Sequence, residues 1–317
     1  MDYSRLHKKL QPNFDILIPF VRFEQELERE LLLSHDTIIQ KNSKFFIVPS
    51  RSHRPLWAQD WLTHCQVHEF NGKSQAVKIL KAMDNLGVYF ETEANNKLAH
   101  GIRKELRELK VRRINFEAPS AFNFKYFAWG LLDDTHLIIC PKPQSQFPLG
   151  WHEFNEDKEI PPNRAYLKLW ELLCLNHIQL KPDDIAIDVG SSPGGWSWAL
   201  SQFVKKVYSV DKAPLDKKIA ARSNILYSAG DAFALNPADY PGCTWFFSDI
   251  ICTPERLLSL VEQWHAQSNV KNFVCTIKFK GPCDFEILKK FLTFENSRII
   301  HLYQNKNEVT WIQQVKP

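Results

Sequence analysis

The pattern of apolar and polar positions differs between the two halves of the chain. In the first half, apolar runs with strand character occupy 14–21 (FDILIPFV) and 125–140 (KYFAWGLLDDTHLIIC), and the second run predicts a hairpin. Between them, apolar residues recur at helical spacing. The pattern predicts helices over 23–33, 73–85 and 96–109, and paired strands over 36–40 and 44–50. We therefore expect a small N-terminal α/β domain over 1–145.

A proline-rich break follows this domain. Residues 141–162 contain five prolines and little periodicity, so we expect the domain boundary there. A second domain is expected over 160–317, beginning with a helix over 165–175 that Asn163 would cap.

Strand and helix patterns then alternate to the end of the chain. Strands are predicted at 185–189, 206–211, 224–231, 244–250, 273–279, 298–304 and 308–315, and helices at 194–204, 214–222, 254–266 and 283–292. Such alternation is typical of a Rossmann-like, doubly wound and mainly parallel α/β sheet. The short NKN turn at 305–307 makes the last strand antiparallel to its neighbour.

The segment DVGSSPGGW at 188–196 lies between a predicted strand and a predicted helix. In open α/β sheets, ligands bind beyond the carboxyl ends of the strands, where this turn lies. Its spacing is not the GxGxxG of a dinucleotide-binding turn, and the sequence contains no GxxxxGK[ST]. The next strand ends in Asp211, an acid suited to a ribose diol. Short glycine turns also occur without a ligand, so the prediction of a cofactor site rests on the glycine turn and Asp211 together.

S-adenosylmethionine (SAM) fits these features best, because it carries a ribose and an adenine but no phosphate. Asp231 follows the third strand and is placed to reach the adenine edge, although an ordinary turn aspartate is an equal interpretation of it. We expect the cofactor site to comprise the glycine turn and three acids at strand ends: Gly190, Ser192, Pro193, Gly194, Gly195, Trp196, Asp211, Asp231 and Asp249.

Four ionisable residues at element ends could carry chemistry at the same edge: Lys168, Asp249, Lys278 and Glu308. Lys278 ends an apolar strand, where a charge requires a partner or a changed protonation state. Methyl transfer to a hydroxyl needs an aligned oxygen and a base for its proton. A lysine with the usual pKa of ~10.4 is a poor base, but burial and a second ammonium bring a lysine into the useful range. Taken alone, Lys168 and Glu308 fit solvated surface residues better, so the hypothesis rests on the four together.

Composition sets limits on partners and location. A formal charge of +4 permits a nucleic-acid partner without requiring one, and Lys110, Arg112 and Arg113 could contact phosphates. Seven cysteines without a CxxC pair predict reduced thiols. HCQVH at 64–68 lacks a second ligand pair, so no metal is expected. With no signal peptide and no apolar stretch of ~20 residues, we expect a cytoplasmic monomer without membrane contact.

The glycine turn and the four ionisable residues resemble the FtsJ-like ribose 2'-O-methyltransferases, whose Lys-Asp-Lys-Glu tetrad corresponds to Lys168, Asp249, Lys278 and Glu308. PNRAYLKLWE (162–171), VYSVD (207–211), SDI (248–250) and NEVTW (307–311) are similar to segments of the ribosomal RNA large subunit methyltransferase M family. The similarity covers most of 125–317. Ala165 replaces a serine of that family, and Ser191-Ser192 replaces the usual Ala-Cys.

The resemblance implies SAM-dependent 2'-O-methylation of a cytidine in large-subunit ribosomal RNA, with Lys278 as the general base. It also implies that the first domain is a shortened, divergent THUMP-type RNA-binding region. A messenger-RNA cap or transfer-RNA ribose would use the same tetrad. A non-catalytic RNA-binding or assembly protein could retain the same fold, so these alternatives stay open.

Overall fold

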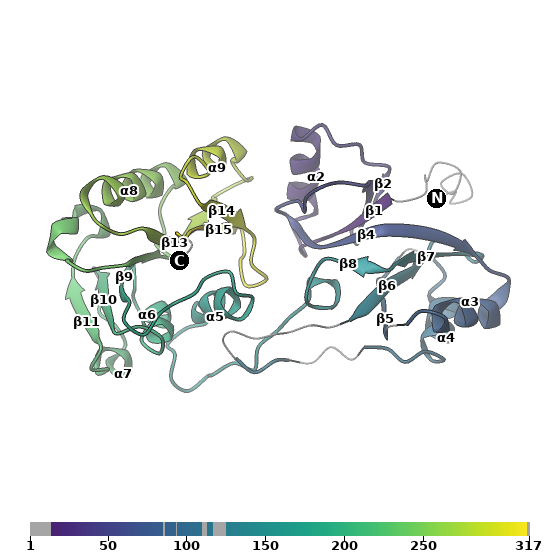
Figure 1. Ribbon diagram of the computed structural model, residues 1–317, viewed down its shortest axis with the longest axis horizontal. Helices are drawn as coiled ribbons and strands as arrows, with labels where there is room; N and C mark the ends of the chain where they lie inside the picture. The colour runs from purple at the N-terminus through teal and green to yellow at the C-terminus, as the bar shows by residue number, and fades with distance from the viewer. Residues whose placement is uncertain (1–13, 85, 93, 110–112, 117–124, 316–317) are drawn as a thin grey trace. The chain divides into compact units, whose positions relative to one another are not determined.

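The computed structural model describes residues 14–84, 86–92, 94–109, 113–116 and 125–315 (Figure 1). The chain divides into two compact units. Unit 1 comprises residues 1–114 and 121–153, and unit 2 comprises residues 115–120 and 154–317. Each unit has its own sheet, so each is described separately.

Unit 1 is built on a mainly antiparallel sheet in the order β2-β3-β1-β4-β7-β6-β5, with β8 beside β4. Its strands are β1 (Phe14–Pro19), β2 (Gln40–Lys41), β3 (Phe46–Pro49), β4 (Ala58–Glu69), β5 (Leu86–Tyr89), β6 (Tyr126–Leu131), β7 (His136–Cys140) and β8 (Lys142–Pro143). The helices are α2 (Glu24–Leu33), α3 (Gly72–Lys81), α4 (Asn96–Arg103) and the 3₁₀ turn η1 (Pro148–Gly150). The predicted hairpin is confirmed as β6 and β7, while β4 and β5 have no counterpart among the predicted elements.

The predicted helix over 96–109 is too long. The helix ends at Arg103, and Glu108 instead forms a parallel bridge with Gly87 of β5. The backbone of Leu109 also donates to the carbonyl of Gly87, so this segment covers part of the β5 edge. An unpaired sheet edge exposes backbone donors and acceptors, and pairing it satisfies them better than another helical turn would.

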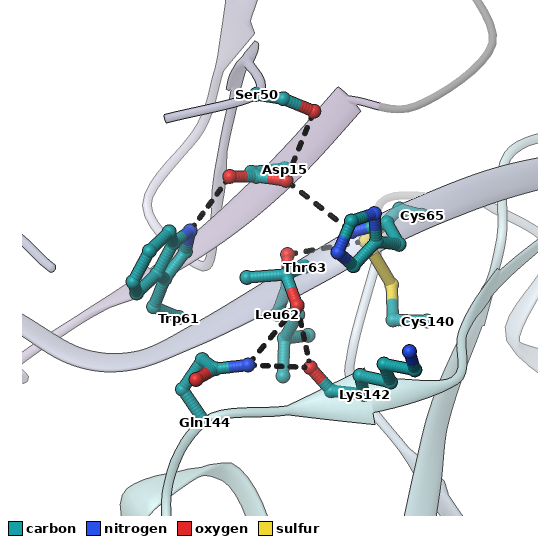
Figure 2. Close-up of a disulfide and its surroundings, with 10 residues drawn as sticks. Asp15, Ser50, Trp61, Leu62, Thr63, Cys65, Cys140, Lys142 and Gln144 are labelled. Carbon is teal, nitrogen blue, oxygen red and sulfur yellow. Dashed lines mark hydrogen bonds between the residues drawn. A yellow bond between two sulfur atoms is a disulfide. The ribbon is translucent and has the colours of Figure 1, made fainter. Parts of the chain in front are cut away.

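The prediction of reduced thiols is wrong for one pair. Cys65 of β4 and Cys140 of β7 form a disulfide within unit 1 (Figure 2). The two residues are 75 apart in sequence, but the register Gln66↔Ile139 makes them neighbours across the β4–β7 ladder, with Cα atoms 4.2 Å apart. The sequence carries no signal for this pairing, because long-range strand register creates it. The five remaining cysteines are free.

Unit 2 is a seven-stranded sheet over its described residues, in the order β11-β10-β9-β12-β13-β15-β14. Its strands are β9 (Ile185–Val189), β10 (Lys206–Asp211), β11 (Ile225–Ala229), β12 (Trp245–Ser248), β13 (Asn272–Lys278), β14 (Ser297–Ile300) and β15 (Glu308–Gln313). The helices are α5 (Tyr166–Cys174), α6 (Gly195–Leu200), α7 (Lys217–Ala220), α8 (Pro254–Gln267) and α9 (Phe285–Phe291), with 3₁₀ turns η2 (Ala232–Ala234) and η3 (Pro237–Asp239). Helices α8 and α9 cover one face, and α5 and α6 the other (Figure 1).

The doubly wound sheet of unit 2 is confirmed. Strands β9 to β13 are mutually parallel, and β15 lies antiparallel between β13 and β14. Because the chain leaves β9 first toward β10 and later toward β12, the strand order reverses beside β9, and the carboxyl ends of the parallel strands meet at one edge. Thr253 caps α8 as predicted, with Pro254 in its first turn. Asn163 is not the cap of α5, which is Ala165; its side chain accepts the amide N–H of Ala165 instead.

Two further expectations can be compared with the described residues. None of the helices in that part of the chain has the length and apolar character needed to cross a bilayer. No group of three or more potential metal ligands occurs among those same residues. HCQVH is a segment of β4, and its cysteine lies in the disulfide.

Candidate active site

A cavity of about 500 Å³ opens at the carboxyl edge of the unit 2 sheet. Ligand pockets of this size hold small molecules, typically within ~300–1,000 Å³. The cavity is lined by residues from the ends of β9 to β13 and the segments around them: Asn163, Ala165, Asp188, Gly190, Ser191, Ser192, Gly195, Trp196, Asp211, Lys212, Gly230, Asp231, Ala232, Phe233, Asp249, Ile250, Ile251, Arg256 and Lys278.

The glycine turn forms one wall of this cavity, and two of its glycines are required by close contacts. Gly190 has φ +74°, and a Cβ there would lie 2.8 Å from Cβ of Ile250. At Gly195 the first turn of α6 approaches α5, and a Cβ would lie 2.2 Å from Oδ1 of Asn163. At Gly190 the positive φ and the contact with Ile250 therefore exclude a side chain, whereas a Cβ at Gly195 would require the Asn163 side chain to move.

Two of the predicted cofactor acids also line the cavity. Asp211 ends β10 and accepts the backbone N–H groups of Ser192 (3.0 Å) and Ala213 (2.9 Å). Asp231 caps η2 through Phe233 and forms an ion pair with Lys212 (2.8 Å), which lowers its pKa. Since each carboxylate oxygen has two acceptor sites, both groups retain acceptor capacity toward a ligand. Asp231 is therefore an ordinary capping aspartate of a turn and also lines the cavity.

A third acid, Asp188, was not among the predicted site residues. It is 1% exposed and lines the cavity from within β9. Its Oδ2 accepts the hydroxyl of Ser197 (2.6 Å), which is also 2.9 Å from the hydroxyl of Ser209. Burial raises the pKa of Asp188 to about 7; the Ser197 hydrogen bond opposes this rise, and the nearby carboxylates Asp249 and Asp211 add to it. The position of this acid before the glycine turn was visible in the sequence, but its burial was not.

The structure brings the four residues of the predicted tetrad into direct contact. Nζ of Lys168 lies 3.0 Å from Oδ1 of Asp249 and 2.6 Å from Oε1 of Glu308. Nζ of Lys278 lies 3.0 Å from the same Oδ1 and donates to the carbonyl of Asp249 (2.6 Å). Asp249 is thus the shared partner of both lysines.

The two lysines differ in exposure and surroundings. The side chain of Lys168 is 9% exposed and that of Lys278 is 23% exposed, and Lys278 alone of the two lines the cavity. Burial lowers the pKa of Lys168, but its two carboxylate partners outweigh burial and raise it overall. Burial likewise raises the pKa of Asp249, and the two ammonium groups outweigh it and lower it overall. Lys168 is therefore held as a cation beside an ionised Asp249.

Glu171 is a second residue that sequence reasoning missed. It lies one helical turn after Lys168 on α5 and is 2% exposed. Its carboxylate accepts the backbone N–H groups of Tyr303 (2.7 Å) and Gln304 (3.1 Å), in the turn before β15. Helix α5 therefore binds both the turn leading to β15 and, through Lys168, the first residue of that strand.

The remaining predicted residues have clear locations. Gly190, Ser192, Gly195, Trp196, Asp211, Asp231, Asp249 and Lys278 line the cavity, whereas Pro193, Gly194, Lys168 and Glu308 are not among its lining residues. Trp196 donates its indole N–H to the carbonyl of Ala165 (2.9 Å). Of the basic residues noted at 110–113, Lys110 and Arg112 lie outside the described residues. Arg113 forms an ion pair with Glu153 in unit 1.

Comparison with known proteins finds matches over the part of the chain that contains the cavity. Residues 161–293 match the family model described as FtsJ-like methyltransferase. The chain is 29% identical over 154 residues to the ribosomal RNA large subunit methyltransferase M of Cellvibrio japonicus, covering 46% of this chain and 43% of the relative. With the protein of the same name from Saccharophagus degradans it shares 28% over 236 residues, covering 67% of this chain and 65% of that relative.

The chain spans about half the length of the first curated relatives that it matches. Within that span, the match confirms the predicted SAM-dependent, mixed α/β methyltransferase domain. Residues 161–293 are therefore similar to FtsJ-like methyltransferases, and the chain is similar to the ribosomal RNA large subunit methyltransferases M.

Proposed function

We propose that this protein transfers a methyl group from SAM to the 2'-hydroxyl of an RNA ribose, at a cytidine of large-subunit ribosomal RNA. The observation that carries the proposal is the contact of Lys168, Asp249, Lys278 and Glu308 beside the cavity. The names of the relatives support ribosomal RNA as the substrate. A hydroxyl that reaches Lys278 would lie next to the glycine turn and its acids.

The cavity has the chemistry that SAM requires. Its wall combines carboxylates with the apolar side chains of Phe233 and Ile250, which suits a ligand with cationic groups and a flat adenine. Asp211 and Asp231 retain acceptor capacity for ribose and adenine groups. We assign cofactor binding to these residues and to Gly190, Ser192 and Gly195. When bound, SAM supplies a methyl group already activated on a sulfonium.

The chemistry left to the protein is alignment and removal of one proton. Transfer of the methyl group from the sulfonium to the ribose O2' would leave a neutral thioether and release the hydroxyl proton, and Nζ of Lys278, as a neutral amine, would accept that proton. Lys168 stays cationic between Asp249 and Glu308, so it orients the shared carboxylate and does not compete for the proton. Alignment of this kind supplies several kcal/mol of a reaction barrier.

Unit 1, which comprises residues 1–114 and 121–153, is assigned to RNA presentation. It would be the divergent THUMP-like domain that we expect over residues 1–145, ahead of a catalytic domain over 160–317. Its mainly antiparallel sheet with α3 and α4 provides a separate folded body next to the methyltransferase domain in sequence. Removal of unit 1 is expected to weaken RNA binding more than SAM binding. Equal RNA affinity without it would argue against a presenting role.

The test is transfer of labelled methyl from SAM to deproteinised large-subunit RNA from a strain that lacks the gene. Lys278→Ala is measured in parallel, with SAM affinity determined by calorimetry. Label recovered as a 2'-O-methyl nucleoside, and lost in the variant at nearly unchanged SAM affinity, supports both the reaction and the base. Unchanged turnover in Lys278→Ala excludes Lys278 as the base.

No label from folded, SAM-binding protein excludes naked large-subunit RNA as substrate. Transfer RNA, capped messenger RNA and assembled ribosomal particles are then offered to the same preparation. Methyl transfer to one of them retains the chemistry and changes the substrate. Failure with all of them leaves a non-catalytic RNA-binding protein as the better description.

A further inference from the structure

The ladder that carries Lys278 and Glu308 continues past the tetrad. Lys278 and Glu308 are register partners in the antiparallel pair β13–β15. One step further, the backbone N–H of Phe279 donates to the carbonyl of Asn307 (3.1 Å). The side chain of Asn307 donates in turn to the carbonyls of Phe279 (3.0 Å) and Gly281 (2.8 Å). These bonds fix the two segments beside each other just beyond the ends of the strands.

A lysine stands on each of these fixed segments. Lys280 follows Phe279, Lys306 precedes Asn307, and both are exposed. The nearby acids are already paired: Glu308, at the adjacent ladder step, with Lys168, and Asp249, which follows β12, with Lys168 and Lys278. Within the described part of the chain, neither Lys280 nor Lys306 forms an ion pair.

Two like charges on adjacent segments repel each other, and an anion between them removes that repulsion. The hydrogen bonds that the Asn307 side chain donates to the carbonyls of Phe279 and Gly281 hold the segments together despite the repulsion. Lys280 follows Lys278, the last residue of β13, by only two residues. A nucleic-acid backbone that brings a ribose to Lys278 would therefore carry its neighbouring phosphates past these lysines.

We propose that Lys280 and Lys306 form a phosphate clamp that binds the RNA backbone next to the target ribose. The inference rests on the proposed function for its ligand, because RNA is the polyanion that function supplies. The clamp holds the strand by charge, so it contributes to RNA affinity without selecting a base.

The experiment measures binding of a short single-stranded RNA to the full chain over a series of salt concentrations. Lys280→Ala, Lys306→Ala and the double variant are compared with the parent protein. Each lost contact with a single strand is expected to reduce the slope of log affinity against log salt by roughly 0.7, so the double variant loses about 1.4. The Michaelis constant for RNA is expected to rise in the double variant, while SAM affinity is unchanged.

Lys271→Ala is the matched control, since Lys271 is exposed and directly precedes the other end of β13. This variant is expected to keep the parent's slope. The clamp is refuted if the double variant binds with the parent's affinity and slope, or if Lys271→Ala lowers the slope as much. A parent protein that methylates no RNA, with a slope that still falls in the double variant, would refute the proposed function and leave the clamp in place.

Discussion

Replacement of Asp188 by asparagine should make unit 2 more stable at neutral pH. The buried carboxyl of Asp188 has a pKa of about 7 against a usual value of 3.8, chiefly because burial disfavours its charged form. At 1.36 kcal/mol for each pKa unit, this difference corresponds to about 4 kcal/mol. Asparagine has nearly the same shape, carries no charge, and can still accept the hydroxyl of Ser197.

The sign follows from proton linkage. The unfolded chain loses the Asp188 proton near pH 4, whereas the folded protein keeps it until about pH 7, so folded Asp188 favours stability at low pH. That contribution is fully present below about pH 4 and is lost as the pH rises to about 7. The advantage of Asp188→Asn over the parent should therefore grow by about 2 kcal/mol between pH 5.5 and 7, and level off by about pH 8.

The assay is scanning calorimetry of both proteins between pH 5.5 and 8.5, following the transition of unit 2. A domain of this size gains roughly 2–4 °C in Tm for each kcal/mol. The difference in Tm should thus widen by roughly 4–8 °C up to pH 7. Asp184→Asn is a control for loss of a buried acid; it should lose stability, because Lys181, Thr244 and Trp245 donate to that carboxylate. A Tm difference between Asp188→Asn and the parent that does not vary with pH would refute the reasoning.

Three further changes have defined outcomes. Glu171→Gln should lower kcat with little change in SAM affinity, because an amide cannot accept both backbone N–H groups of the turn before β15. In the double variant with Glu308→Gln, the Glu171 change should add little further loss of kcat, and full additivity of the two losses would argue against a role of Glu171 through Glu308. Gly190→Ala should reduce both SAM affinity and thermal stability, since it adds a Cβ 2.8 Å from Ile250 at φ +74°, and calorimetry with SAM would detect this. Cys65→Ala should destabilise unit 1 by roughly 4 kcal/mol through the loss of a 75-residue cross-link, measured as a urea-unfolding shift that the reduced parent reproduces.

Much of unit 2 could be predicted because local patterns determine it. The parallel strands are short apolar runs, and the Thr253-Pro254 pair marks the start of α8 in the sequence. Unit 1 was harder to predict. Strand β4 mixes polar and apolar residues, since it lies at the centre of a sheet whose faces differ in burial along its length. The register that joins Cys65 to Cys140 depends on segments 75 residues apart.

Site residues that stand at the ends of helices or strands could be predicted from the sequence. Site residues whose role depends on their burial could not. Lys278, Asp249 and Asp211 stand at or next to strand ends, and parallel strands bring those ends together. Glu171 sits within an apolar helix and resembles an ordinary helix acid. Its role depends on backbone N–H groups more than 130 residues away, which no local pattern reveals.

The antiparallel direction of β15 explains why four residues from distant segments meet as one group. Residues directly opposite each other in an antiparallel pair lie on the same face of the sheet, and Lys278 and Glu308 are such a pair. Glu308 contacts Lys168 of α5, so the face they share is the one that α5 covers. Asp249, following the adjacent strand β12, reaches both lysines through one oxygen. A parallel last strand would begin at the opposite edge and leave Lys168 without Glu308, so the terminal hairpin is a requirement of the tetrad as well as of the fold.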